Sequence, residues 1–268
     1  MSILLLLIFI LIGLFAGFTA GLLGIGGGLV TVPALLCVFK NMGFSEGYDI
    51  HVAVGTSLAT MIFTATSSGY SHFKHGKVLI KESQVLLPVM AIGAIVGAAI
   101  ANYLPGRELE VIFAIAVILF GIYFLTNNEH ENHQDYHRMT PAVLICFGFF
   151  IGLISAMMGI GGGLLTVPLL VYYRYPLKNA IATSALTGIP IAVLGAISYL
   201  LLGYEISHDQ QRVVGYVYWP AFVVIGIVST IAAPYSAKLV YCLPVKILRR
   251  CFGVFLILTG CSILLFPH

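Results

Sequence analysis

Long apolar segments alternate with short polar turns along the chain, and one longer polar stretch, Asn127–Arg138, lies near its middle. Five apolar segments precede this stretch and five follow it. In chain order they are 2–23, 29–39, 52–70, 85–103, 109–126, 141–158, 164–173, 180–202, 214–239 and 247–266. Most are close to the ~20 residues that a membrane-spanning helix needs. The pattern predicts an all-α, polytopic integral membrane protein with eight to ten transmembrane helices.

The composition agrees with this class and narrows the partners. Hydrophobic residues make up 60% of the chain and charged residues only 9%, whereas a soluble domain carries roughly 25% charged residues. The expected surroundings are therefore a lipid bilayer, and we expect the cell (inner) membrane. Basic residues do not form a patch interleaved with aromatic side chains, so we expect no nucleic-acid partner. The sequence leaves open whether the protein forms a homo-oligomer.

The two halves of the chain share several motifs. Gly24–Pro33 reads Gly-Ile-Gly-Gly-Gly-Leu-Val-Thr-Val-Pro, and Gly159–Pro168 repeats it with one change. Ala53–Ser57 similarly matches Ala180–Ser184. A unit duplicated in this way is typical of transporters built from structural repeats. The predicted parts are transmembrane repeat 1 (1–126), a polar linker (127–140) and transmembrane repeat 2 (141–268).

The short apolar segments 29–39 and 164–173 raise the question of whether they cross the membrane. If they do, ten of the thirteen basic residues fall on one side, and only Lys40, Arg107 and Arg212 fall on the other. If they re-enter without crossing, the division is more even. Cytoplasmic loops carry the excess of Lys and Arg, so crossing is favoured. Each repeat then has an odd number of crossings, which predicts inverted repeats with both termini outside the cytoplasm.

Each glycine-rich motif predicts a break between two helices. Glycines permit a sharp turn and a close approach of the backbone, and the helix that restarts after them offers unpaired N–H groups and a positive dipole end. Such a terminus binds anions without a basic side chain. Pro33 and Pro168 are expected early in the restarted helices, where a missing N–H costs little. The alternative is that glycines only serve close packing, as the spacing of Gly13, Gly17 and Gly21 indicates.

Hydroxyl residues near the breaks are expected to complete the anion site. Two lie about one turn into the restarted helices, and two Thr-Ser pairs recur once per half. The alternative role of such hydroxyls is a bond to their own helix backbone. The substrate-binding candidates are Gly24, Gly26, Gly27, Gly28, Thr31, Thr56, Ser57, Gly159, Gly161, Gly162, Gly163, Thr166, Thr183 and Ser184.

Charged groups are missing from the middle of the apolar segments. All ten acidic residues lie in loops or at segment ends, whereas proton pumps and cation carriers usually need an intramembrane carboxylate. A neutral site of N–H and hydroxyl donors suits an anion better. The linker segment Glu129–His137 is more typical of a solvated loop than of a metal site, and we expect neither a metal nor a cofactor.

The paired Gly-x-Gly-Gly-Gly-x-x-Thr-x-Pro motif, the Thr-Ser elements and the segment Ser71–Val78 together resemble the TauE/SafE family, also called sulfite exporters or toluene-sulfonate uptake permeases. The resemblance covers nearly the whole chain. It implies a secondary transporter of small sulfur-containing or organic anions, such as sulfite, sulfoacetate and sulfonates. By position, it implies that the residues of the two glycine motifs belong to the site.

We therefore expect a secondary carrier that moves a small anion by alternating access, and not an enzyme. A membrane-embedded enzyme would need a nucleophile–base pair or a metal cluster in the spans, and the sequence shows neither. A transporter or channel for a neutral solute or a cation is the alternative, because a neutral site also accepts a neutral ligand. The sequence does not identify the substrate, the direction of transport or a coupling ion.

Overall fold

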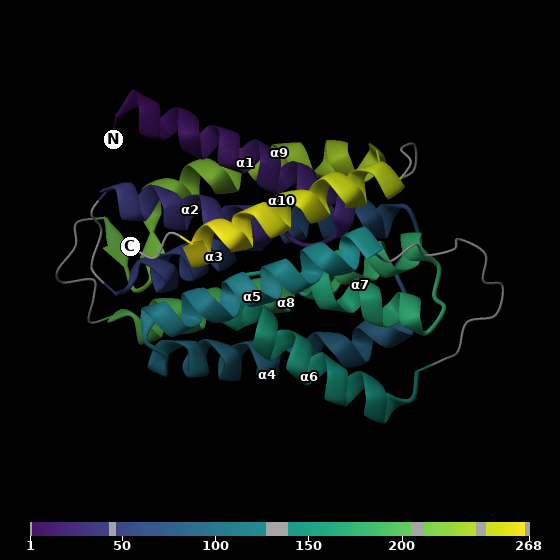
Figure 1. Ribbon diagram of the computed structural model, residues 1–268. Coiled ribbons are helices and arrows are strands. Elements are labelled where there is room, and N and C mark those ends of the chain that lie inside the picture. Colours follow the sequence, from purple (N-terminus) through teal and green to yellow (C-terminus); the bar gives the residue numbers. More distant parts are fainter. Residues whose placement is uncertain (1, 43–46, 127–138, 205–211, 240–244, 266–268) are drawn as a thin grey trace.

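The computed structural model describes residues 2–42, 47–126, 139–204, 212–239 and 245–265, which form a bundle of helices running roughly along one common direction (Figure 1). In chain order the helices are α1 (Ile3–Leu23), α2 (Gly28–Met42), α3 (Asp49–Lys74), α4 (Ile80–Tyr103), α5 (Gly106–Thr126), α6 (Pro141–Met158), α7 (Gly163–Tyr172), α8 (Leu177–Leu202), α9 (Trp219–Leu239) and α10 (Val245–Leu265). A short antiparallel hairpin of β1 (Val213–Val214) and β2 (Val217–Tyr218) precedes α9.

Six of the described helices are long and apolar enough to cross a membrane, namely α1, α3, α4, α6, α8 and α9. Helix α3 is the central one, because 78% of its most apolar window is buried inside the protein, against 33% for α1. Large apolar side chains on the outer helices, such as Leu11 and Phe15, are exposed. A bilayer solvates such a surface, so the prediction of an all-α polytopic membrane protein is confirmed.

Small residues bring the outer helices together in two parallel pairs. On α1, Gly13 lies against Val228 of α9 and Gly17 lies against Ser229 and Ala232, as their spacing predicts. On α4, Gly97 lies against Leu153 of α6 in the same manner. Side chains at these glycines would collide with the neighbouring backbone, so the close approach depends on their absence.

The inner helices α3 and α8 cross in the opposite sense. Leu58, early in α3, lies near Gly195, late in α8, whereas Gly69, late in α3, lies near Ala185, early in α8. The two helices are therefore antiparallel. Helices α5 and α10 form a second antiparallel pair, in which Gly121 and Gly253 face each other's backbone.

These pairings fix the direction of the short helices α2 and α7. If they returned to the side from which they came, α3 would run parallel to α8 and α5 parallel to α10. The observed antiparallel pairs, together with parallel α1 and α9, require the chain to reverse direction at every helix (Figure 1). Helices α2 and α7 thus continue the alternation, although they are shorter than a full span.

Several predicted boundaries differ from the structure. Helix α4 begins at Ile80 rather than at residue 85, because the polar residues Lys81, Glu82 and Ser83 form its first turn, where an acidic side chain interacts favourably with the helix dipole. Pro33 is the sixth residue of α2, and Pro168 takes the same place in α7. The expectation of an early position for these prolines is wrong, since the sixth position lies past the first turn, where a backbone N–H would otherwise donate within the helix. The predicted linker, 127–140, lies outside the described residues except for Met139 and Thr140.

Candidate functional site

The first glycine motif forms a sharp break between α1 and α2. Gly24 ends α1 in the left-handed conformation, with φ 67°, and its N–H donates to the Ala20 carbonyl at 2.9 Å. Gly26 and Gly27 also have positive φ, at 79° and 83°. Side chains other than glycine rarely adopt this conformation. The prediction of a glycine-dependent helix break is confirmed here.

The second motif forms a break of the same length between α6 and α7. Gly159 ends α6 with φ 66°, but Gly162 has φ −52° and is the residue from which α7 begins. Only one glycine of this break is therefore in the left-handed region, against three in the first. The two motifs have nearly the same sequence but not the same backbone conformation.

The two breaks lie directly against each other in the interior. A Cβ placed on Gly28 would strike the carbonyl of Gly159, and a Cβ on Gly163 would strike the carbonyl of Gly24. Gly24 and Gly28 occupy the same motif positions as Gly159 and Gly163, so the contact is reciprocal. We call this place the crossing, defined as the contact between residues 24–28 and 159–163.

The serine hydroxyls of the two Thr-Ser pairs donate hydrogen bonds to backbone carbonyls of the crossing. The hydroxyl of Ser57, on α3, donates to the Gly159 carbonyl at 2.8 Å. The hydroxyl of Ser184, on α8, donates to the Gly24 carbonyl at 3.2 Å and to the Ile181 carbonyl of its own helix at 2.8 Å. Each half of the chain therefore holds the break of the other half, and both serines are fully buried.

The threonines of the same pairs bind turns that precede outer helices, rather than the crossing. The hydroxyl of Thr56 accepts a hydrogen bond from the Tyr218 amide at 2.9 Å, immediately before α9. The hydroxyl of Thr183 accepts one from the Leu79 amide at 3.0 Å, immediately before α4. These two hydroxyls hold the turns that lead into the outer helices. No motif in the sequence indicated these partners, because they lie more than 100 residues away.

The hydroxyls of the restarted helices differ from each other. Thr31 donates to the Gly27 carbonyl at 3.1 Å and is thereby bound to its own helix. Thr166 is fully buried, and its hydroxyl has no hydrogen-bond partner among the described residues. Leaving a buried hydroxyl unpaired is unfavourable. A ligand that accepts a hydrogen bond near the start of α7 would remove this cost.

Some backbone N–H groups at the helix starts of the crossing also lack a hydrogen-bond acceptor among the described residues. Among the described residues, no acceptor is found for the amides of Gly28 and Leu29 at the start of α2, or of Gly163 at the start of α7. Described acidic and basic residues lie away from this region; Lys40, for example, pairs with Glu110 at 3.0 Å near one end of the bundle. The crossing is therefore a buried, charge-free place with N–H and hydroxyl donors.

Met61 is a residue of the crossing that the sequence did not single out. Its thioether would lie 3.0 Å from a Cβ on Gly26, 2.9 Å from one on Gly28 and 3.1 Å from one on Gly161. The side chain is 1% exposed. The sequence feature that could have identified Met61 is its position one turn after Ser57, on the same face of α3.

Two buried histidines have backbone partners. His51 is buried, and its Nε2 lies 3.0 Å from the Ala101 carbonyl. His72 is buried as well, with Nε2 3.0 Å from the Gly21 carbonyl. The linker segment Glu129–His137 lies outside the described residues. Within the described part of the chain, no three His, Cys, Asp or Glu side chains are grouped so as to hold a metal ion.

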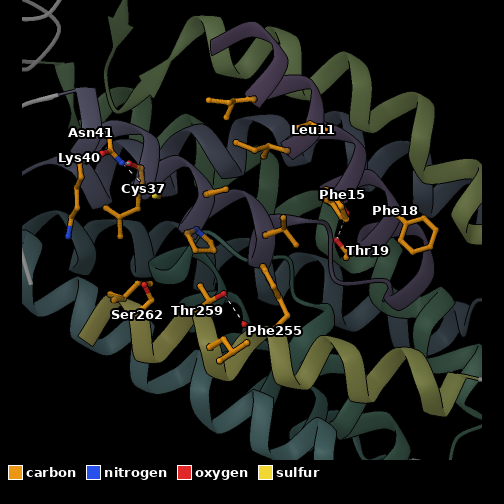
Figure 2. A pocket seen from close by; sticks show the side chains of 18 of the residues that line it. Leu11, Phe15, Phe18, Thr19, Cys37, Lys40, Asn41, Phe255, Thr259 and Ser262 are labelled. Carbon is orange, nitrogen blue, oxygen red and sulfur yellow. Dashed lines mark hydrogen bonds between the residues drawn. The ribbon is translucent and has the colours of Figure 1, made fainter. Parts of the chain in front are cut away.

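An apolar pocket of about 1230 Å³ lies apart from the crossing, between α1, α2 and α10 (Figure 2). Phe15 of α1 and Phe255 of α10 line it, and Lys40 and Asn41 mark one end. None of the glycines or Thr-Ser pairs of the candidate site is among its lining residues. The pocket is therefore separate from the candidate site.

Comparisons with known proteins identify a family and several relatives. The model of the sulfite exporter TauE/SafE family matches residues 9–263. A probable membrane transporter protein of Haemophilus influenzae is 30% identical over 259 residues, which cover 97% of this chain and 98% of the relative. Another probable membrane transporter protein, from Methanocaldococcus jannaschii, is 31% identical over 239 residues, covering 88% and 85%. No solved structure matches the chain significantly. The chain therefore belongs to the TauE/SafE sulfite exporter family of membrane transporters.

Proposed function

We propose that this transporter is a secondary carrier for a small anion, a sulfur oxyanion or organosulfonate such as sulfite or sulfoacetate. The observation that carries the proposal is the crossing, where two helix starts and two serines meet in a buried place without charged side chains. Anions bind readily at helix starts because the free N–H groups and the dipole both favour negative charge. The reciprocal contacts make the crossing the natural centre of a two-sided transport path.

The repeats support alternating access. Helices α1 and α6, α3 and α8, and α4 and α9 occupy corresponding places in the two predicted repeats, 1–126 and 141–268. Their contacts also correspond, since α1 pairs with α9 as α6 pairs with α4. Antiparallel α3 and α8 fit a two-fold axis in the membrane plane, so we infer inverted repeats. In such a carrier one repeat rocks against the other around a fixed site.

The distribution of basic residues supports an orientation. With every helix reversing direction, nine of the twelve described Lys and Arg residues fall at the end of the bundle where α3 and α9 finish. We infer that this end faces the cytoplasm, in the cell membrane. An anion then leaves the cell down the membrane potential, which contributes about 2.3 kcal/mol per charge at 100 mV. Export therefore needs no coupling ion.

Counterflow in proteoliposomes tests the proposal. Purified protein is reconstituted with unlabelled sulfite inside, and uptake of radiolabelled sulfite is measured against unlabelled sulfonates, neutral solutes and cations. Saturable exchange that sulfur oxyanions or sulfonates inhibit is the expected result. Protein-free liposomes and the Gly26→Val, Gly161→Val double variant are the controls. Exchange inhibited only by neutral solutes or cations, or a fully active double variant, would contradict the proposal.

A further inference from the structure

The two halves of the crossing differ at one equivalent position. Met61 follows Ser57 by four residues on α3, and Gly188 follows Ser184 by four residues on α8. Both serines hold the opposite break, so Met61 and Gly188 lie at matching places relative to it. One half therefore carries a long, flexible thioether where the other carries no side chain.

Met61 fills its half of the crossing. The thioether contacts three glycines, Gly26 and Gly28 of the first break and Gly161 of the second, and the residue is buried. Methionine adapts its shape readily because it is unbranched and has three rotatable bonds. It closes the space between the two breaks without fixing it rigidly.

Gly188 leaves its half open. The residue is buried, yet a Cβ placed there would meet a single described atom within 4 Å, the Cβ of Ala65 at 3.8 Å, its own helix backbone and chain neighbours aside. Most other buried glycines in the spans behave differently, as at Gly97, where a Cβ would strike the backbone of Leu153. Close helix packing therefore does not explain a glycine at position 188.

Other features of the same half favour a ligand there. Under the two-fold relation inferred above, Gly188 corresponds to Met61, which lies against Gly28 and Gly26, and the equivalent places for Gly188 are Gly163 and Gly161. Gly163 begins α7, whose Thr166 has a buried hydroxyl without a partner among the described residues. The equivalent Thr31, on the Met61 side, is already bonded to Gly27. Open space and a free donor thus occur in the same half of the crossing.

We propose that the anion binds off the two-fold axis, against α8 at Gly188 and the start of α7, and that Met61 limits its size. This inference rests on the proposed function, because it specifies where in the crossing the anion lies. Met61 acts as a specificity-determining side chain: it forms the wall opposite Gly188 and leaves room for compact anions. Bulkier sulfonates require the thioether to move aside.

The Gly188→Ala variant separates a binding role from a packing role. A Cβ fits at this position, and alanine is a better helix former than glycine, so the variant should unfold at the same temperature as the wild type or a higher one. Counterflow should nevertheless show a KM for sulfite raised about tenfold, because the methyl group enters the volume of the anion. Wild-type KM in a stably folded Gly188→Ala variant would overturn the inference.

The Met61→Ala variant tests the size limit. Removing the thioether should raise kcat/KM for an arylsulfonate relative to sulfite by roughly tenfold or more, the range typical of small changes in a pocket wall. Met90→Ala is the matched control, since Met90 is equally buried on α4 and lies against Gly152 rather than a break. An unchanged substrate ratio in Met61→Ala, or an equal shift in Met90→Ala, would contradict the size limit. If Met61→Ala does not fold, Met61→Leu is measured instead: leucine keeps the volume but is branched and less able to move aside, so the same ratio should fall rather than rise.

Counterflow by the wild-type protein separates failure of the off-axis position and size limit from failure of the proposed function. Sulfite counterflow by the wild type with no effect of Gly188→Ala or Met61→Ala removes only the off-axis position and the size limit. Absence of exchange for every sulfur oxyanion and sulfonate in the wild type removes the proposed function itself.

Discussion

At the scale of single residues, the hydroxyl groups of the candidate site differ in whether the fold already gives them a hydrogen-bond partner. Ser57 and Ser184 satisfy carbonyls of the crossing, whereas Thr56 and Thr183 satisfy amides of outer turns. Hydroxyls engaged in this way contribute to the fold whether or not a substrate is present. Thr166 has no such engagement among the described residues, so its hydroxyl is the best single probe of binding.

The Thr166→Val variant should bind substrate more weakly without loss of stability. Valine has nearly the shape of threonine and removes an unpaired buried polar group, so the thermal unfolding temperature should stay the same or rise. A hydrogen bond to a charged ligand contributes roughly 1.5–3 kcal/mol, so KM should rise about tenfold or more. Thr31→Val is the control, because that hydroxyl bonds Gly27 and its loss should act mainly on stability. A Thr166→Val carrier with unchanged KM argues against a substrate at α7.

The Gly28→Ala variant should reduce stability. Its Cβ would strike the Gly159 carbonyl, and overpacking a tight interior contact costs about 1–3 kcal/mol. Thermal unfolding in detergent measures the effect, with Gly148→Ala of α6 as the control, since the nearest groups there are movable side chains of Leu86 and Val89. Equal unfolding temperatures for the two variants would mean that the breaks are not closely packed.

The glycine breaks could be predicted from the sequence, whereas the partners of the hydroxyls could not. Three adjacent glycines inside an apolar run have a local conformational meaning that the sequence carries by itself. The bonds of Thr56 to Tyr218 and of Thr183 to Leu79 join residues on different helices, and only the packed fold brings them together. Met61 escaped notice for the same reason, since its position one turn after Ser57 gains meaning only when the fold shows that Ser57 binds the opposite break.

At the scale of helices, the Thr56 and Thr183 bonds act at opposite ends of the bundle. Thr56 holds the turn before α9, next to the hairpin, and Thr183 holds the turn before α4. Both bonds are present together, and under the proposed alternating access this arrangement corresponds to a carrier closed at both ends. Opening toward one side requires the bond at that end to break while the other remains.

The Thr183→Val and Thr56→Val variants should therefore favour opposite open states. Spin labels at 77 and 174 report on one end, and labels at 108 and 214 report on the other; all four positions are exposed. Thr183→Val should lengthen the first distance and leave the second unchanged, and Thr56→Val should do the reverse. Identical distance changes in both variants would show that the two bonds do not act separately.

At the scale of the whole molecule, the sequence predicted the class of fold and the structure supplied the pairing of helices. Hydrophobicity alone identified the apolar segments, since a span must be apolar over its length. It could not show that α1 packs on α9 rather than on its neighbours in the chain, because apolar helices offer many similar surfaces. The hairpin of Val213–Tyr218 was also missed, as two-residue strands are too short to show a period.

Membrane orientation is the prediction that belongs to this scale. If α2 and α7 cross, cysteines introduced at Lys77 and Arg174 face the cytoplasm, and one at Arg212 faces outward. If they re-enter, Lys77 and Arg174 lie on opposite sides. Labelling intact cells with a membrane-impermeant thiol reagent in a cysteine-free background should therefore modify only the cysteine at 212. Modification at 77 as well as at 212, but not at 174, is the result expected of re-entry and would contradict the alternating topology.

The position of the bound anion tests the central claim most directly. Selenite has the shape and charge pattern of sulfite, and selenium is located unambiguously by its anomalous scattering. A crystal structure of the wild-type protein with selenite should place selenium at the crossing, between Gly188 and the start of α7, within hydrogen-bond reach of Thr166. Selenium in the pocket between α1, α2 and α10, or at the ends of the bundle with the crossing unchanged, would contradict the account.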